Sequence, residues 1–150
     1  MVCQDPRVDE GGLVIGPETG IAVDELLALY GSVGWSAYTG SPDLLRAGVA
    51  GASYVVTARR GGRLVGLARA LSDGATICYL QDVLVDPAEQ RRGIGRALVT
   101  AVLDRYRDVR QKVLLTDDEP GQRAFYESLG YAEIRDHGPL RCFVRFDSGA

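Results

Sequence analysis

An apolar strand that runs directly into a basic, glycine-containing turn and then into a helix restricts the fold of this chain more than any other segment. The segment from Asp82 to Val99 reads DVLVDPAEQRRGIGRALV. Its apolar run ends at Pro87, and helical spacing begins at the glycines. The N–H groups of a first helical turn have no partner within the helix and lie at its positive end. The segment therefore predicts a site for a pyrophosphate.

The spacing of this turn separates it from other phosphate-binding loops. It reads Gln90-x-x-Gly93-x-Gly95, with no Gly-Lys-Ser/Thr of a P-loop and no third glycine of a dinucleotide-binding fingerprint. An ordinary strand-to-helix turn whose glycines serve packing is the alternative. Full positive charges favour the phosphate site, and three side chains supply them: Arg91, Arg92 and Arg96.

Two segments resemble motifs of the GNAT N-acetyltransferase superfamily. The turn is similar to its coenzyme A loop, Gln/Arg-x-x-Gly-x-Gly/Ala. The segment AFYESLGY, from Ala124 to Tyr131, resembles the late helix of that superfamily and its exit, with the tyrosine at Tyr126 and the stop at Gly130. With the order of the expected elements, the resemblance covers about residues 12 to 146.

Composition bounds the class of protein. The chain has 150 residues, 46% hydrophobic and 25% charged, which predicts one globular domain over residues 1–150, with a core of about 12–146 and flexible residues 1–11. The net charge of −3 does not indicate a nucleic-acid partner. No run of 18 apolar residues and no signal-peptide pattern is present, so we expect no membrane association and a cytoplasmic location.

Cysteine and histidine usage predicts neither a disulfide framework nor a metal site. The chain has three widely spaced cysteines and one histidine, with no CxxC pair. Cys78 and Cys142 lie in apolar strand patterns, so we expect both to be buried free thiols.

The periodicity of the chain predicts an α/β fold in which three antiparallel strands form a meander and a later strand runs parallel to the last of them. Strands are expected at 13–15, 53–59, 63–71, 76–85, 113–115, 131–134 and 140–146, and helices at 23–30, 41–48, 93–107 and 120–129. This order matches the superfamily. It implies a GNAT-like sandwich with a mixed antiparallel/parallel sheet of six to seven strands and about four helices.

The resemblance implies an acetyl-CoA-dependent N-acetyltransferase that transfers acetyl directly to a primary amine of a small molecule or a peptide N-terminus. In the superfamily, pantetheine lies in a gap between two splayed parallel strands. Backbone groups of Val83, Leu84 and Val85 would contact it here, and the N–H of Val83 would stabilise the oxyanion. The expected contacts of the loop with coenzyme A are Gln90, Arg91, Arg92, Gly93, Ile94, Gly95, Arg96 and Ala97.

Two side chains are candidates for the proton transfers that acyl transfer requires. Tyr126 is the candidate acid, since a phenol can protonate the leaving thiolate; a core tyrosine is the alternative. Asp82 is the candidate base, with a structural carboxylate or a water chain as alternatives. Strand alternation predicts that Gln81 faces away from Asp82.

The acceptor side is expected in the glycine-bounded segment from Gly34 to Gly40, which contains Trp35 and Tyr38. An aromatic wall beside a carboxylate favours a cationic amine, whereas packing against the meander is the alternative. A non-catalytic acyl-CoA-binding module and a nucleotide-binding protein are the competing functions. The resemblance also implies pairing of two copies through C-terminal strands. The sequence identifies neither the acceptor nor the acyl group.

Overall fold

The structure is a computed structural model that describes residues 7–147. The chain divides into two compact units, which meet in the sequence at Leu115 and Thr116. The prediction of a single domain stays a prediction.

The first unit is built on a six-stranded mixed sheet with the strand order β1-β2-β3-β4-β5-β6. Its strands are β1 (Arg7–Val8), β2 (Leu13–Pro17), β3 (Tyr54–Arg60), β4 (Arg63–Ser72), β5 (Ile77–Val85) and β6 (Gln111–Leu114). All neighbours are antiparallel except β5 and β6, which are parallel. The predicted meander and the predicted parallel strand after a helix are therefore confirmed.

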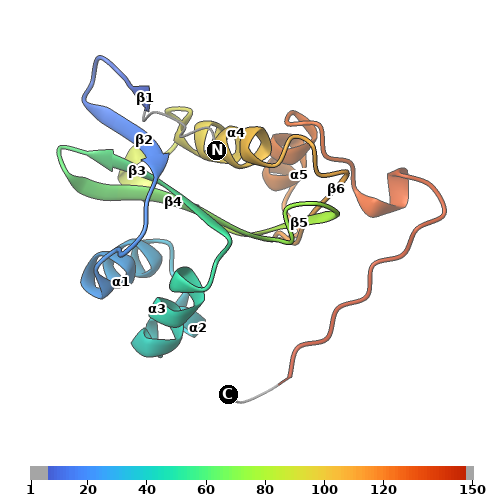
Figure 1. Cartoon of the computed structure of the whole chain (residues 1–150), viewed down its shortest axis with the longest axis horizontal. Helices are drawn as coiled ribbons and strands as arrows, with labels where there is room; N and C mark the ends of the chain where they lie inside the picture. Colours follow the sequence, from blue (N-terminus) through green and yellow to red (C-terminus); the bar gives the residue numbers. More distant parts are fainter. Residues whose placement is uncertain (1–6, 148–150) are drawn as a thin grey trace. The chain divides into compact units, whose positions relative to one another are not determined.

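Helices cover both faces of this sheet. Helices α1 (Val23–Ser32), α2 (Ser36–Thr39) and α3 (Pro42–Ala50) lie on one face, and α4 (Ile94–Arg105) lies on the other (Figure 1). The apolar stripe of α1 packs into a core with α3 and the strands. This core consists of Leu26, Leu29, Tyr30, Leu45, Val49, Val55, Leu64, Leu67 and Leu84. Burial of each large side chain contributes about 1.5–3 kcal/mol, which holds the N-terminal helices on the sheet.

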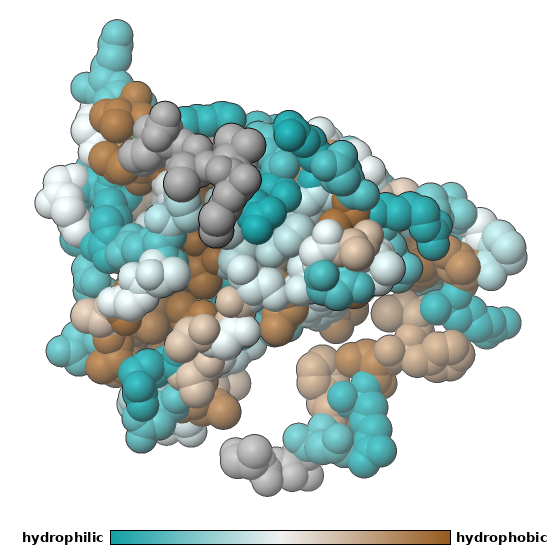
Figure 2. Space-filling model, in the orientation of Figure 1, coloured by the Kyte–Doolittle hydropathy of each residue, from teal (hydrophilic) through white to brown (hydrophobic). Residues whose placement is uncertain are grey.

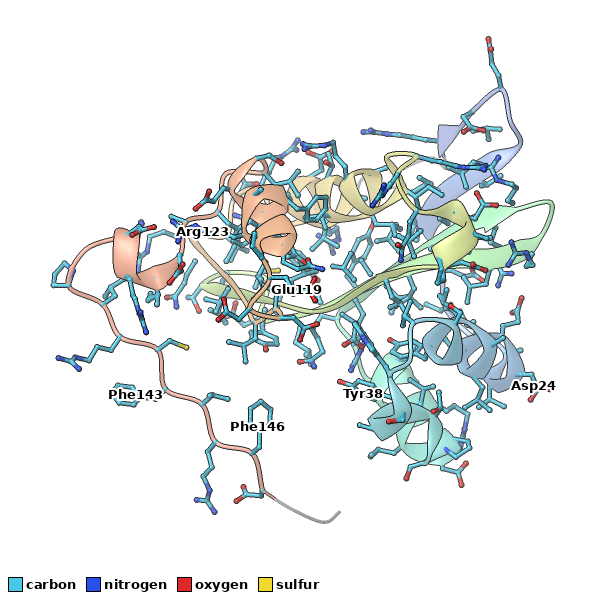
Figure 3. All side chains as sticks on the ribbon, turned by 180° about the vertical axis from the view of Figure 1, so that it is seen from behind. Asp24, Tyr38, Glu119, Arg123, Phe143 and Phe146 are labelled. Atoms are coloured by element: carbon cyan, nitrogen blue, oxygen red, sulfur yellow. The ribbon has the colours of Figure 1, made fainter. Side chains whose placement is uncertain are left out.

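The second unit contains helix α5 (Pro120–Glu127) and the 3₁₀ helix η2 (Ile134–Asp136). The strands predicted at 131–134 and 140–146 are wrong, because neither segment is a strand in the structure. Phe143 and Phe146 are more than four-fifths exposed and point away from the ribbon (Figure 3). An apolar segment forms a strand only where a second strand exchanges backbone hydrogen bonds with it, and residues 116–147 contain no strand.

The C-terminal segment also changes the prediction for the cysteines. Cys78 is buried, as predicted, but Cys142 is exposed because it lies in the unpaired segment. Apolar and hydrophilic residues of that segment are both exposed at the surface (Figure 2). Cys3 lies outside the described residues.

Two segments predicted to be irregular carry regular structure. Arg7 and Val8, within the segment expected to be flexible, pair with Ile15 and Val14. Residues 36–39, expected as a loop, form the short helix α2. Both elements are too short for their sequence periodicity to be recognised, so tertiary contacts decide them.

Candidate active site

Strand β5 is paired with β6 over less than half of its length. The parallel register joins Ile77 to Gln111 and ends where Leu80 faces Leu114. Strand β5 continues to Val85, so between Gln81 and Val85 it has no strand partner on that side among residues 7–115. This separation is the gap that the sequence predicts between the two strands.

The backbone groups at this open edge come from alternate residues. The N–H of Asp86 donates to the carbonyl of Val65 (2.8 Å), and Val85 faces Gly66 in the same antiparallel ladder. Because hydrogen-bonded pairs alternate along such a ladder, Leu84 directs its backbone groups to β4, and Val83 and Val85 direct theirs to the open edge. Three residues were predicted to contact pantetheine through their backbone. The backbone groups of Leu84 face β4 and not the open edge.

The phosphate loop begins at the same edge. The side-chain amide of Gln90 donates to the carbonyl of Val85 (3.0 Å), which confirms the direction of that carbonyl. Arg91 (φ 61°) and Gly93 (φ 79°) both adopt left-handed backbone conformations before α4 begins. At Gly93 a β-carbon would meet no atom within 4 Å, so the surface above this residue is open.

The first turn of α4 presents backbone donors. No side chain caps the helix, and the N–H groups of its first three residues, Ile94, Gly95 and Arg96, precede the first bond within the helix. That bond runs from the N–H of Ala97 to the carbonyl of Gly93 (3.0 Å). The N–H of Ala97, which was predicted to contact coenzyme A, is therefore the first N–H of α4 that has a partner within the helix.

A 3₁₀ helix, η1 (Pro87–Glu89), joins β5 to the loop. The carboxylate of Asp86 caps it by accepting from the N–H of Ala88 (2.9 Å) and also pairs with Arg63 (2.6 Å). The hydrogen bond from Arg63 and that from the N–H of Ala88 hold the pKa of Asp86 below its usual value. Asp86 therefore stays ionised at neutral pH and continues to cap η1 there.

A β-bulge lies where β5 leaves β6. Arg69 faces Asp82, but the next residue of β4, Ala70, faces Leu80, so Gln81 is an extra residue without a cross-strand partner. Gln81 was predicted to face away from Asp82. Instead its amide donates to the hydroxyl of Tyr38 (3.2 Å), and Asp82 accepts from the hydroxyl of Tyr30 (2.8 Å). The prediction was wrong because the bulge interrupts strict strand alternation.

The carboxylate of Asp82 is the centre of a buried polar cluster. Besides Tyr30, the Nε of Arg69 donates to the same oxygen, Oδ2, and Arg69 also donates to the carbonyl of Gly48 on α3 (2.9 Å). Asp82 is 3% exposed and Arg69 is 7% exposed. Burial and the neighbouring charge of Asp82 raise the pKa of Tyr30 far above its usual value, so this tyrosine remains a donor.

An aromatic group stands beside this cluster. The ring centroid of Tyr30 lies 5.8 Å from that of Trp35 and 5.5 Å from that of Tyr38, both in edge-on arrangements. Trp35 and Tyr38 are only half-buried, and Tyr38 projects from α2 toward the sheet (Figure 3). Both pack against the core, so part of each ring serves packing and part remains accessible.

Tyr126 belongs to the second unit, at the C-terminal end of α5. Its ring packs edge-on against Phe125 (5.0 Å) and Tyr131 (5.9 Å). Desolvation raises the pKa of Tyr126 above the ordinary tyrosine value. The phenol is therefore protonated at neutral pH, as a proton donor must be.

Sequence reasoning missed two residues of the buried cluster, Arg69 and Tyr30. Arg69 gave a recognisable signal, since it interrupts the otherwise apolar run from Leu64 to Leu71. A charged residue inside such a strand needs a buried partner of opposite charge. Tyr30 gave none, because a tyrosine on an amphipathic helix is typical of a core.

Between residues 7 and 147, no group of three or more His, Cys, Asp or Glu side chains is arranged to hold a metal ion. None of the helices in that range is long and apolar enough to cross a membrane.

Comparison with known proteins identifies the family. The family model for the acetyltransferase (GNAT) family matches residues 21–131. The chain belongs to the GNAT family. Its match to the model includes the open edge of β5, the phosphate loop and the segment that ends at Tyr131.

Individual proteins agree with this assignment. The chain is 36% identical over 95 residues to a mycothiol acetyltransferase of Clavibacter michiganensis subsp. michiganensis, covering 63% of this chain and 30% of that protein. A GNAT-family acetyltransferase of Streptococcus pneumoniae TIGR4 shares the fold, with a TM-score of 0.78 and 24% identity over 91% of this chain and 99% of the other. An aminoglycoside N-acetyltransferase, AAC(6')-Iy, whose structure contains CoA, gives a TM-score of 0.67 with 15% identity over 99% and 100% of the two chains. The chain spans 27% to 30% of the length of the first curated relatives it matches.

Proposed function

We propose that this chain is an acetyl-CoA-dependent N-acetyltransferase that transfers acetyl directly to a primary amine of a small molecule or a peptide N-terminus. The observation that supports this most directly is the open edge of β5, which is followed through η1 by the phosphate loop and by the first turn of α4, where no side chain caps the helix. One ligand that carries an extended amide-bearing arm and a pyrophosphate can occupy both. Coenzyme A has that chemistry.

The pyrophosphate is proposed to lie against the N–H groups from Arg91 to Arg96. Their donors point out of the positive end of a helix of 12 residues. Arg91 and Arg92 are exposed beside them and add full charges. The pantetheine arm then follows Val83 and Val85, whose backbone groups face the open edge.

Replacing Gly93 by valine should weaken the affinity for coenzyme A at least tenfold. A β-branched side chain adds bulk above the contact surface and strains a backbone with φ 79°. Calorimetric titration with coenzyme A measures the change. Gly74→Val is the matched control, since Gly74 has a similar φ (76°) and equally open surroundings but lies in the β4–β5 turn. Unchanged affinity in a folded Gly93→Val protein would contradict the placement.

The proposed reaction uses few groups of the chain. As the amine nitrogen bonds to the thioester carbon, the N–H of Val83 donates to the developing oxyanion at the open edge. When the carbon–sulfur bond breaks, Tyr126 donates its proton to the leaving thiolate. The amine must also lose a proton, and that step needs a base.

Asp82 is better suited to position groups than to act as the base. Its carboxylate is buried and already accepts hydrogen bonds from Arg69 and Tyr30. Protonating it would leave the guanidinium of Arg69 buried without a counter-charge, which is strongly unfavourable. We therefore propose that the amine proton leaves through water. Asp82 is proposed to fix the positions of α1, α3 and the bulge relative to one another, directly through Tyr30 and indirectly through Arg69. An acidic limb of the pH–rate profile that disappears in Asp82→Asn would instead identify a base.

The acceptor is proposed to contact the exposed parts of Trp35 and Tyr38. Because the charge of Asp82 is balanced by Arg69, attraction of an ammonium group to these rings is the main recognition left at this point. Trp35→Ala should raise the acceptor KM by about fivefold to thirtyfold, which corresponds to about 1–2 kcal/mol, and leave the KM of acetyl-CoA unchanged. Steady-state kinetics with a panel of amines measures both. An increase confined to acetyl-CoA would contradict this assignment.

The same panel tests the proposed activity itself. A non-catalytic acyl-CoA-binding module would bind acetyl-CoA but release no coenzyme A thiol with any amine. Amine-dependent thiol release, with stoichiometric acetylated product by mass spectrometry, would establish the enzyme.

A further inference from the structure

Glu89, the last residue of η1, is a buried carboxylate among three guanidinium groups. It is 6% exposed. Its Oε2 lies 3.1 Å from Nε of Arg60 and 3.5 Å from Nη1 of Arg92, and its Oε1 lies 3.8 Å from Nη2 of Arg63. A carboxylate this deeply buried requires such partners to remain charged.

The three arginines connect Glu89 to the β3–β4 hairpin and to the phosphate loop. Arg60 and Arg63 flank the turn between β3 and β4, and Arg60 also donates to the carbonyl of Gly11 before β2 (2.7 Å). Arg92 belongs to the phosphate loop itself. Glu89 therefore joins the loop to the β3–β4 hairpin, whose Arg63 also pairs with Asp86 at the start of η1.

The backbone next to Glu89 needs this support. Two residues further on, Arg91 is the one residue other than glycine with positive φ between residues 7 and 147. Such a conformation persists only where the surroundings determine it. On its N-terminal side the loop is held by Glu89 and by Gln90, and on its C-terminal side by α4.

We propose that Glu89 is a positioning residue for coenzyme A, an inference that rests on the proposed function. It holds the backbone from Gln90 to Gly93 in the form that presents donors to the pyrophosphate. It also holds the guanidinium of Arg92, whose side chain remains 60% exposed and available to the ligand. Glu89 does not itself contact the anion.

An effect of Glu89 through its charge and an effect through positioning predict opposite changes in coenzyme A affinity for Glu89→Gln. The substitution removes a negative charge near a site for a polyanion, so electrostatics alone predicts tighter binding of coenzyme A. Loss of the anchor predicts weaker binding, because the loop backbone is no longer held. We expect the dissociation constant of coenzyme A, measured by calorimetry, to rise at least tenfold.

Glu18→Gln is the matched control. Glu18 is a partly buried carboxylate that pairs, like Glu89, with an arginine of β3, in this case Arg59 (2.7 Å). Arg59 and Arg60 are successive strand residues, so their side chains leave the sheet on opposite faces. Glu18→Gln should lower the unfolding midpoint comparably and leave coenzyme A affinity within twofold of wild type.

The calorimetric results distinguish coenzyme A binding by the protein from the positioning role of Glu89. Failure of the wild-type protein to bind coenzyme A would overturn the proposed function and this inference with it. Binding by wild type together with unchanged or tighter binding by Glu89→Gln would overturn this inference alone. If Glu89→Gln does not fold, Glu89→Asp serves, since it keeps the charge but shortens the reach to Arg60. In that variant at least threefold weaker binding supports the anchor, and wild-type affinity overturns it.

Discussion

Replacing Arg69 by methionine should lower the free energy of unfolding by about 3–5 kcal/mol, because it leaves the carboxylate of Asp82 buried without its counter-charge. The hydrogen bond from Arg69 to the carbonyl of Gly48 is lost as well. Equilibrium denaturation in urea measures the effect. Since α1 and α3 both meet this cluster, we also expect reduced acceptor binding in the variant.

Two further variants locate the cause of that loss. Arg46→Met removes a guanidinium from an exposed pair with Asp43 (3.6 Å) and should cost less than about 1 kcal/mol. The double variant Arg69→Met with Asp82→Asn contains no buried charge but keeps an acceptor for Tyr30, so it should be more stable than Arg69→Met alone. If Arg69→Met alone were as stable as wild type, the ion pair between Arg69 and Asp82 would not be what holds α1 and α3 on the sheet.

Tyr126→Phe should reduce turnover about 10²-fold, within the usual range for loss of a general acid. The ring still packs against Phe125 and Tyr131, so the KM of acetyl-CoA should hardly change. The measurement requires conditions in which the chemical step limits the rate. Because burial raises the pKa of Tyr126, wild-type activity should not fall through loss of this proton below about pH 10, the ordinary tyrosine value.

Tyr131→Phe is the control for this prediction. It removes a hydroxyl from the neighbouring ring of the same unit and should leave turnover within about threefold of wild type, since no proton-transfer role is assigned to it. Wild-type turnover in Tyr126→Phe would mean that the thiolate takes its proton from another donor.

The phosphate loop shows how far local sequence determines structure. Gly93 adopts a conformation that glycine favours, and Pro87 begins a 3₁₀ helix where its fixed φ is suitable. These properties belong to the residues themselves, so the loop and the start of α4 are recognisable without a structure. The pairing of Glu89 with Arg60 is not, because the two residues lie 29 positions apart.

The bulge at Gln81 shows where local reasoning fails. Strand alternation correctly predicts the separate environments of most residues of β5, but one extra residue turns Gln81 to the same face as Asp82. The register between β4 and β5 creates this bulge, and register depends on packing of both strands against α1 and α4. The role of Asp82 changes for the same reason, since Arg69 reaches it only across that register.

The sequence by itself therefore determined the α/β class, the meander, the parallel strand after α4, the phosphate loop and the family resemblance. Each follows from residues close together in the chain, through backbone preferences and apolar periodicity. Only the tertiary structure decided which backbone groups of β5 are open, that Asp82 is paired with Arg69, and that residues 140–146 form no strand within their unit. These features depend on contacts between segments that are distant in the sequence, and the free energies of such contacts cannot be predicted from neighbouring residues alone.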